Sequence, residues 1–207
     1  MIQAQSKLPK LLSFEEFLTW YPENGSRYEL LDGEIVEVRP VGSHEEVTSY
    51  LIRKIDREIE RLKLPWFIPN TCCVKPIDSD ENGYISDGII LDRSSLSADP
   101  LWKRASTITR GTSARLVIEV VSTNWQDDYA KKLDDYEALG IPEYWIVDYR
   151  GLGGRRFIGS PKQPTITVCQ WIEGVYQLVQ FRKGDRLQSP TFPELNLAVA
   201  EIIAFGG

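Results

Sequence analysis

The segment 115–148 contains the pattern that most restricts how this chain can fold. Residues 115–121 read Arg-Leu-Val-Ile-Glu-Val-Val, an apolar run typical of a buried strand, and residues 144–148 form a second such run. Between them, residues 127–139 form a predicted helix that ends at Gly140. A strand, a helix and a strand in close succession form a βαβ crossover, in which the two strands are parallel. The sequence therefore predicts an α/β domain.

Two further helices are predicted upstream by the same start signal. Ser13 is followed three residues later by Glu16, and Ser43 by Glu46. Both pairs match the capping box, in which a serine side chain begins a helix. The first helix is short, and the second covers 44–63. The apolar residues of the second helix recur at helical spacing, at Val47, Leu51, Ile55, Ile59 and Leu62.

Strands are predicted before and after this central unit. Residues 27–39 match a hairpin, because Asp32-Gly33 is a turn signal between two strand-like runs. Residues 93–112 show no regular pattern and are expected to form an irregular loop. The apolar tail 195–205 is expected to pack back onto the domain. The other predicted strands cover 71–74, 84–91, 165–171 and 175–181.

Length and composition are those of one globular domain. The chain has 207 residues, of which 42% are hydrophobic and 26% charged. We expect a single domain over 1–207, with its core at about 13–150 and with 151–207 packing on that core or on a dimer partner. No apolar run approaches the roughly 18 residues of a membrane-spanning helix. Residues 1–12 also lack an apolar leader segment, so we expect neither a membrane protein nor a secreted one.

Cysteine content and net charge restrict the compartment and the partners. Cys72, Cys73 and Cys169 are odd in number and two are adjacent, which argues against a disulfide framework and favours a reducing cytoplasm. The net charge is −6, which disfavours a protein that holds nucleic acid through a broad basic surface. Acidic side chains are nevertheless the ligands that a hard divalent cation requires.

Three polar residues stand where apolar ones are expected. Asp87 stands just before an apolar run, Glu119 in the middle of a predicted strand, and Lys132 on the helix that follows. Two carboxylates at neighbouring strand ends can share one Mg²⁺, which activates water and neutralises phosphoryl charge, and an ammonium can offset the remainder. Each residue also has a structural interpretation. Asp87 then belongs to a turn, Glu119 to a buried ion pair, and Lys132 to the solvated helix surface.

Helical geometry distinguishes Lys132 from its neighbour Lys131. Tyr129 and Tyr136 lie on one face of the predicted helix at about 100° per residue. Lys132 falls close to that face, which is expected to meet the sheet, whereas Lys131 falls nearly opposite and is expected to be solvated. Asp128 lies one turn before Lys132 and can pair with it.

A set of short motifs follows in order along the chain. They are Tyr28-Glu29-Leu30-Leu31-Asp32-Gly33-Glu34, His44, Asp87-Gly88-Ile89-Ile90, Val117-Ile118-Glu119-Val120-Val121-Ser122, Asp128 with Lys132-Leu133-Asp134-Asp135-Tyr136, and Gly140-Ile141-Pro142-Glu143-Tyr144-Trp145-Ile146-Val147-Asp148. Together they resemble the Uma-type putative restriction endonuclease family of the PD-(D/E)xK nuclease superfamily. The resemblance runs from about residue 13 to 150 and continues more loosely to the C-terminus.

The resemblance implies a restriction-endonuclease-like α/β fold, with a central mixed β-sheet flanked by helices, an N-terminal β-hairpin and C-terminal strands. It also implies that Asp87 and Glu119 bind Mg²⁺ or Mn²⁺ and that Lys132 is a catalytic lysine moved from strand to helix. The usual lysine position, two residues after Glu119, is Val121 here. The family's usual proline before the metal-binding aspartate is replaced by Ser86.

Three more residues are candidates for supporting roles. Glu29 matches an acidic position of the family, and it is either a further ligand or an outward-facing hairpin residue. His44, the chain's single histidine, is either a group that assists proton transfer or contacts phosphate, or a residue of the helix start, which we favour. Asp128 is expected to pair with Lys132 rather than to bind the metal.

The function implied by the resemblance is that of an endonuclease that hydrolyses phosphodiester bonds in DNA, with a homodimer as the expected assembly. Two alternatives remain open. One is a non-catalytic protein of the same fold that serves as an interaction or assembly subunit, and the other is a phosphodiesterase that acts on a small molecule. Contact with DNA is expected from a small basic patch of Lys103, Arg104, Arg110 and Arg115.

Overall fold

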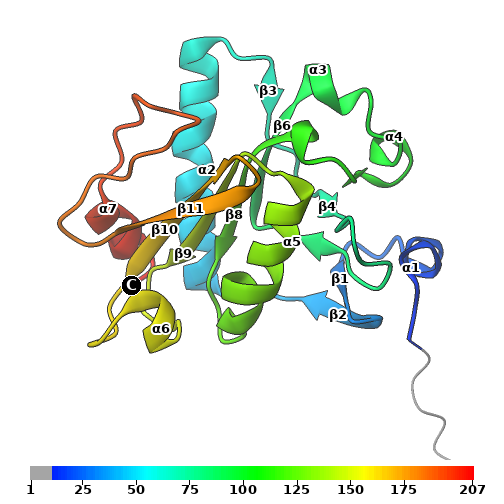
Figure 1. Cartoon of the computed structure of the whole chain (residues 1–207), viewed down its shortest axis with the longest axis horizontal. Helices are drawn as coiled ribbons and strands as arrows, with labels where there is room; N and C mark the ends of the chain where they lie inside the picture. The colour runs from blue at the N-terminus through cyan, green and yellow to red at the C-terminus, as the bar shows by residue number, and fades with distance from the viewer. Residues whose placement is uncertain (1–10) are drawn as a thin grey trace, which may run out of the picture.

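A six-stranded mixed sheet forms the centre of the fold (Figure 1). The structure is a computed structural model that describes residues 11–207. Residues 1–10, within the segment where no leader is expected, lie outside the described part. The strand order is β11-β10-β9-β8-β6-β3. β8 (Ala114–Val120) and β9 (Glu143–Asp148) are parallel, and the other neighbouring pairs are antiparallel. The predicted mixed sheet and its parallel pair are therefore confirmed.

Two smaller sheets lie beside the central one. β1 (Arg27–Leu31) and β2 (Glu34–Val38) form the predicted hairpin, and its turn residues Asp32 and Gly33 have positive φ angles of 51° and 79°. A three-stranded sheet has the order β5-β4-β7. Its strands are β4 (Cys73–Val74), β5 (Tyr84–Ile85) and β7 (Thr107–Ile108). The central sheet contains, besides β8 and β9, the strands β3 (Trp66–Phe67), β6 (Gly88–Asp92), β10 (Thr165–Ile172) and β11 (Val175–Phe181).

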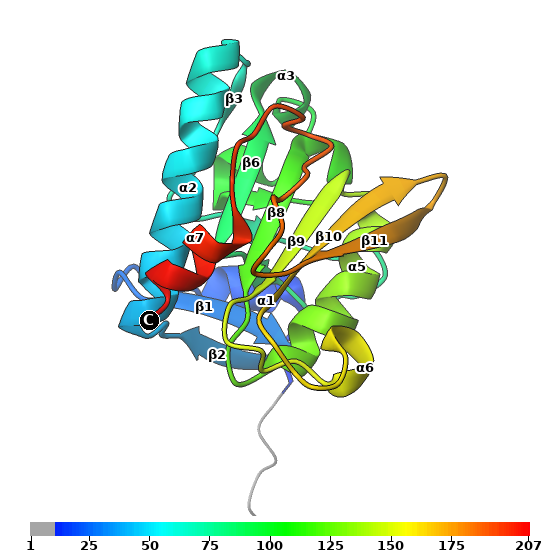
Figure 2. The ribbon, with the colours of Figure 1, turned by 90° about the vertical axis from the view of Figure 1, so that its left-hand side faces the viewer.

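Helices cover both faces of the central sheet (Figure 2). α2 (Gly42–Leu62) and α7 (Val199–Phe205) pack on one face, and α5 (Lys132–Leu139) packs on the other. Successive residues of a strand point to opposite faces, so β8 divides its side chains between two cores. Ile118 and Val120 enter the core beneath α2, whereas Val117 enters the core beneath α5. Glu119 therefore lies on the α5 side of the sheet.

The remaining helical segments are short. They are α1 (Phe14–Trp20), α3 (Arg93–Leu96), α4 (Trp102–Ala105), η1 (Gly111–Ser113) and α6 (Arg155–Ile158). The region 93–112, expected to be irregular, therefore contains α3, α4, β7 and η1. The buried Asp99 organises it, because its carboxylate accepts bonds from the backbone N–H groups of Thr109 and Arg110 and from the Ser113 hydroxyl. Within residues 11–207, no helix has the length and apolar character that crossing a membrane requires.

The capping predictions are correct for one helix and wrong for the other. Ser13 and Glu16 form the capping box of α1. α2 instead begins at Gly42, with Val41 as an N-cap residue that makes no side-chain bond. The Ser43 hydroxyl bonds to the Tyr149 hydroxyl at 3.0 Å, so it is engaged by tertiary structure.

The predicted helix 127–139 also differs at its start. Asp127–Lys131 form a π-helical turn, η2, and the N–H of Lys132 bonds to the Asp127 carbonyl. α5 continues from this turn to Leu139, and Gly140 ends it with a φ of 76°, as predicted. π turns inside helices occur frequently at functional sites.

Candidate functional site

A pocket of about 500 Å³ lies between the β1–β2 hairpin, the first turn of α2, the end of β8 and the η2 turn. Its wall includes carboxylates from four separate segments of the chain. All six of the residues singled out in the sequence line it, namely Glu29, His44, Asp87, Glu119, Asp128 and Lys132. The fold thus brings these residues into one place.

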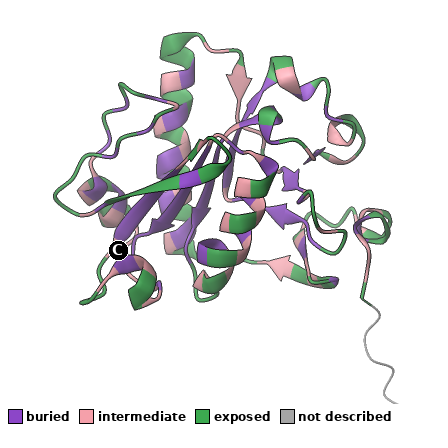
Figure 3. Ribbon diagram, viewed as in Figure 1, coloured by how far each residue is buried: buried purple, intermediate pink, exposed green. Residues whose placement is uncertain are grey.

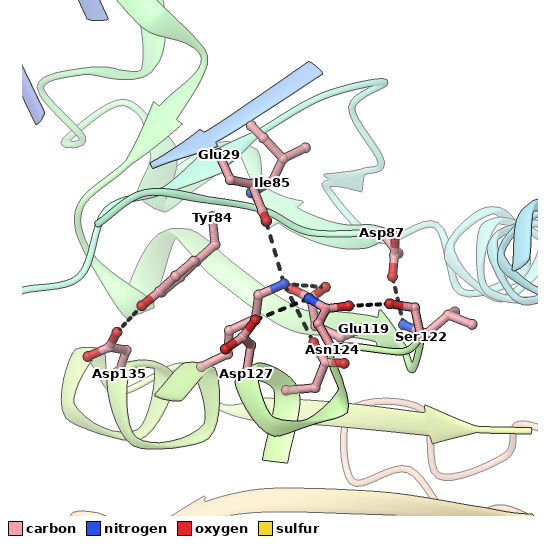
Figure 4. Close-up of polar contacts among 12 residues, drawn as sticks. Glu29, Tyr84, Ile85, Asp87, Glu119, Ser122, Asn124, Asp127 and Asp135 are labelled. Atoms are coloured by element: carbon pink, nitrogen blue, oxygen red, sulfur yellow. Dashed lines mark hydrogen bonds and ion pairs between the residues drawn. The ribbon is translucent and has the colours of Figure 1, made fainter. Parts of the chain in front are cut away.

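Lys132 stands at the centre of a carboxylate cluster. Its side chain is only 6% exposed, and its Nζ lies 3.0 Å from Glu119 Oε2, 3.5 Å from Glu29 Oε1 and 3.6 Å from Asp128 Oδ1. Figure 4 shows Glu29, Asp87 and Glu119 reaching the site from separate segments. Although burial opposes the charged form, these carboxylates and Asp87 raise the pKa of Lys132 well above its usual value, so the side chain is an ammonium.

Glu119 is held by two donors. Its Oε1 accepts a hydrogen bond from the Tyr136 hydroxyl at 2.8 Å, and its Oε2 accepts one from Lys132. Burial is the main cause that raises the pKa of Glu119 well above its usual value, with Lys132 opposing and neighbouring carboxylates adding to the rise. Burial likewise raises the pKa of Asp128 to about 7. The cluster therefore has more carboxylates than one lysine can neutralise.

Asp87 lies between β5 and β6 and is hydrogen-bonded to the end of β8. Its Oδ2 accepts a 2.7 Å bond from the N–H of Val120, the residue after Glu119. His44 Nε2 lies 3.2 Å from the same oxygen and 2.9 Å from the Val120 carbonyl oxygen. Both neighbours of Nε2 are acceptors, so this nitrogen carries the proton. Burial lowers the pKa of His44, but the contact with Asp87 more than offsets it and raises the pKa overall.

The structure shows where two of the candidates for supporting roles lie. His44, which we expected to serve the helix start, is buried with its ring against Asp87 and Val120. Glu29 does not face outward from the hairpin. Its side chain is 8% exposed, and its Oε1 accepts a 2.9 Å bond from the N–H of Ile85 in β5.

Two expectations about basic residues are corrected. Lys131 was expected to be solvated, but its Nζ pairs with Asp32 Oδ1 at 2.5 Å across to the hairpin turn. Two of the four residues of the expected basic patch are neutralised, because Arg104 pairs with Glu15 and Arg115 with the buried Asp92. These charges are satisfied by intramolecular partners that sequence spacing does not reveal.

Two tyrosines contact the charged residues of the site and were not predicted from the sequence. Tyr136 was not among the predicted site residues, yet its hydroxyl donates to Glu119. The ring of Tyr84 lies 5.7 Å from Lys132 Nζ, and its hydroxyl donates to Asp135. Helical spacing signals that Tyr136 is buried, but the partner of its hydroxyl depends on how α5 packs on β8.

The pocket offers a divalent cation few protein ligands. Within residues 11–207, no group of three or more His, Cys, Asp or Glu side chains is arranged to hold a metal by itself. Mg²⁺ commonly uses one or two protein carboxylates and completes its shell with water and substrate phosphate. A carboxylate oxygen also has a second lone pair when one is already bonded. Asp87 and Glu119, in a pocket with excess negative charge, fit this requirement.

Comparisons with known proteins identify the family of the chain. The sequence model of the Uma2 family, described as "Putative restriction endonuclease", matches residues 14–200. This confirms the resemblance indicated by the motifs. No curated protein matches the chain.

A solved structure shares the fold. It comes from Anabaena variabilis ATCC 29413 and is described as a putative nuclease belonging to DUF820. The two chains are 16% identical, and the match has a TM-score of 0.68 over 95% of this chain and 99% of the other. At this identity the likeness concerns the fold alone, and it agrees with the expected nuclease-like α/β architecture.

Proposed function

Since the chain belongs to the Uma2 family of putative restriction endonucleases, we propose that it is a Mg²⁺- or Mn²⁺-dependent endonuclease that hydrolyses phosphodiester bonds in DNA. The observation that carries the proposal is the buried Lys132 ammonium, bonded to Glu119 in the pocket that Asp87 also lines. A buried lysine within a carboxylate cluster is costly to maintain for stability alone, and perturbed pKa values of this kind concentrate at functional sites.

Each residue of the pocket has a role in this reaction. Asp87 and Glu119 would hold the cation, which supplies activation of water and neutralisation of phosphoryl charge. Lys132 places a positive charge where negative charge develops on the phosphoryl oxygens. Tyr136 fixes the orientation of Glu119, and His44 together with the Val120 N–H fixes that of Asp87.

The proposal extends to the setting of the reaction. The substrate is DNA, and the protein acts as a homodimer, because two copies of the centre can cut the two strands of a duplex in one binding event. The cysteines Cys72, Cys73 and Cys169 are all free and buried, which supports a reducing compartment, the cytoplasm.

The test compares two aspartates. We expect the wild-type protein to cleave plasmid DNA with Mn²⁺ and to lose this activity in EDTA. Asp87→Asn should abolish cleavage and weaken Mn²⁺ binding measured by calorimetry, whereas Asp78→Asn, at an exposed loop position, should match the wild type in both. Mn²⁺ binding by Asp87→Asn equal to that of the wild type would refute the metal assignment. A wild type that cleaves no substrate with any of several cations would favour the non-catalytic alternative.

A further inference from the structure

β11 is an outer strand of the central sheet with an open edge. It pairs with β10 along one side, and no other strand among residues 11–207 pairs with its other side. The free N–H and C=O groups of such an edge are a template for another strand, and proteins usually protect edges with charges, prolines or bulges. β11 itself contains none of these features, and one of its outward N–H groups, that of Tyr176, donates to the carboxylate of Glu137 in α5. The strand's residues, Val-Tyr-Gln-Leu-Val-Gln-Phe, are uncharged, and its register with β10 is regular.

The side chains of β11 are also unusually exposed. Val175, Leu178 and Val179 are 55%, 49% and 53% exposed, and Figure 3 shows β11 mostly exposed beside its buried neighbours β9 and β10. Leu178 and Val179 are consecutive, so they lie on opposite faces of the sheet. An added strand would continue both faces and cover apolar surface on each.

We infer that β11 pairs in antiparallel fashion with β11 of a second copy, joining two six-stranded sheets into one. The register that overlaps the whole strand centres on Leu178, which then lies opposite the partner's Leu178. In the same register, Glu173, which precedes the strand, lies opposite the partner's Lys183, which follows it. Glu173 and Lys183 are exposed and form no ion pair within residues 11–207, so the two ends are complementary in charge. A parallel arrangement would instead place like charges together.

This inference gives the proposed homodimer its surface and does not depend on nuclease activity. β10 and β9 separate β11 from β8, which carries Glu119. Each copy therefore keeps its pocket away from the paired strands, and the two centres belong to one continuous sheet. A failure of the interface would leave cation binding intact, which distinguishes the two proposals experimentally.

The first test uses a disulfide across the two-fold axis. Leu178→Cys places two thiols on directly opposite positions, where Cβ atoms in an antiparallel pair are about 4.5–5.5 Å apart. The three native cysteines are buried, so the new thiol reacts first. We expect mild oxidation to yield a covalent dimer of Leu178→Cys and little or none of Ile77→Cys, a control at a loop position that is 62% exposed. Equal cross-linking of the two variants would overturn the inference.

The second test uses charge and sedimentation equilibrium of the full chain. Leu178→Lys opposes two like charges and removes apolar contact, so the dimer Kd should rise about tenfold or more, whereas Ile77→Lys should leave it unchanged. Glu173→Lys should weaken the dimer, and adding Lys183→Glu should restore it. A wild type that is monomeric at micromolar concentration, or a dimer insensitive to Leu178→Lys, would overturn the inference. Mn²⁺ binding by each variant, measured in parallel, reports that the pocket is intact.

Discussion

Lys132 shows how one charge can support a site and the fold at once. Its ammonium is buried among Glu29, Glu119 and Asp128, and these carboxylates would lose their counter-ion if the side chain were shortened. One interpretation of the sequence placed this lysine on the solvated helix surface, where it would be dispensable for folding. The structure argues otherwise, because breaking a buried ion pair leaves uncompensated charge behind.

We therefore expect Lys132→Ala to lower the free energy of unfolding by about 3–5 kcal/mol. Where circular dichroism shows that the variant is folded, its Mn²⁺-dependent cleavage should fall by a factor of about 10²–10³. Lys131→Ala is the matched control, because its partner Asp32 is 79% exposed and such pairs contribute less than about 1 kcal/mol. Urea denaturation and an oligonucleotide cleavage assay measure the two effects. Equal cleavage by the wild type and Lys132→Ala would remove the lysine from the mechanism.

At the residue scale, the sequence identified the charged members of the site but not their contacts. Helical periodicity was sufficient to distinguish Lys132 from Lys131, since it reports which side of a helix meets the sheet. It does not report that the imidazole of His44 reaches Asp87, because that contact requires α2 to start near the end of β8. Side-chain partners far apart in sequence follow from tertiary packing alone.

At the scale of elements, identical local signals had different outcomes. Ser13 caps α1 as predicted, whereas Ser43 lies inside α2, which begins one residue earlier, and its hydroxyl bonds to that of Tyr149, just after β9. The predicted strand 84–91 is divided between two sheets, and Asp87 lies at the division. Apolar periodicity was enough to place the long α2 helix and the β8–β9 pair. It gave no indication of the π turn, whose backbone bonds depend on the packing around it.

Gly111 is expected to be intolerant of any side chain. It lies in η1 against the end of α5, where an added Cβ would stand 2.3 Å from the Leu139 carbonyl oxygen and 2.5 Å from the Gly140 carbonyl carbon. These are backbone atoms, so the segments must separate. Gly111→Ala should lower the unfolding free energy by at least about 1–3 kcal/mol. Gly42→Ala, in α2 with open space around it, should be neutral or slightly stabilising. Chemical denaturation that ranks the two variants equally would contradict this packing.

Asp92 is expected to make the fold sensitive to acid. Burial of its carboxyl group raises the pKa, but bonds from Ser94 and Arg115 outweigh that effect and hold the pKa at about 2, below the ordinary 3.8. A depressed pKa in the folded state gives stability that is present above the ordinary value and lost as pH falls toward about 2. Asp92→Asn should cost about 1.5–3 kcal/mol at neutral pH and should flatten the decline between pH 4 and 2. Thermal melts across this range, with Asp78→Asn as control, measure the difference.

At the scale of the whole molecule, the distribution of charge determines how strongly the proposed DNA substrate would bind. The net charge is −6, the pocket is acidic, and two of the four expected patch residues are paired internally. Arg150 lines the pocket and is exposed, and Arg39, which also lines it, is 78% exposed and pairs with Glu37 at 2.8 Å. A few such cations can provide local contact but cannot hold a duplex firmly against general repulsion.

DNA binding is therefore expected to be weak, to strengthen with divalent cation, and to fall steeply between about 50 and 200 mM salt. Fluorescence anisotropy of a labelled duplex, with Ca²⁺ or with EDTA, measures all three properties. Arg150→Ala should weaken binding, whereas Arg104→Ala, whose charge is already paired with Glu15, should change it less. Tight binding in EDTA that persists at high salt would contradict this account.

The charged residues of the pocket belong to segments of the chain that are synthesised at different times. Glu29 and Asp87 emerge early, Lys132 much later, and β9, the parallel neighbour of β8, later still. Contacts between distant parts of a chain form late in folding, because their loops must close first. An unfinished or truncated chain that ends before β9 therefore has its acidic residues but no assembled centre. If the protein has the proposed nuclease activity, that activity therefore arises only when synthesis is nearly complete, and incomplete chains do not cleave the DNA of the cell that makes them.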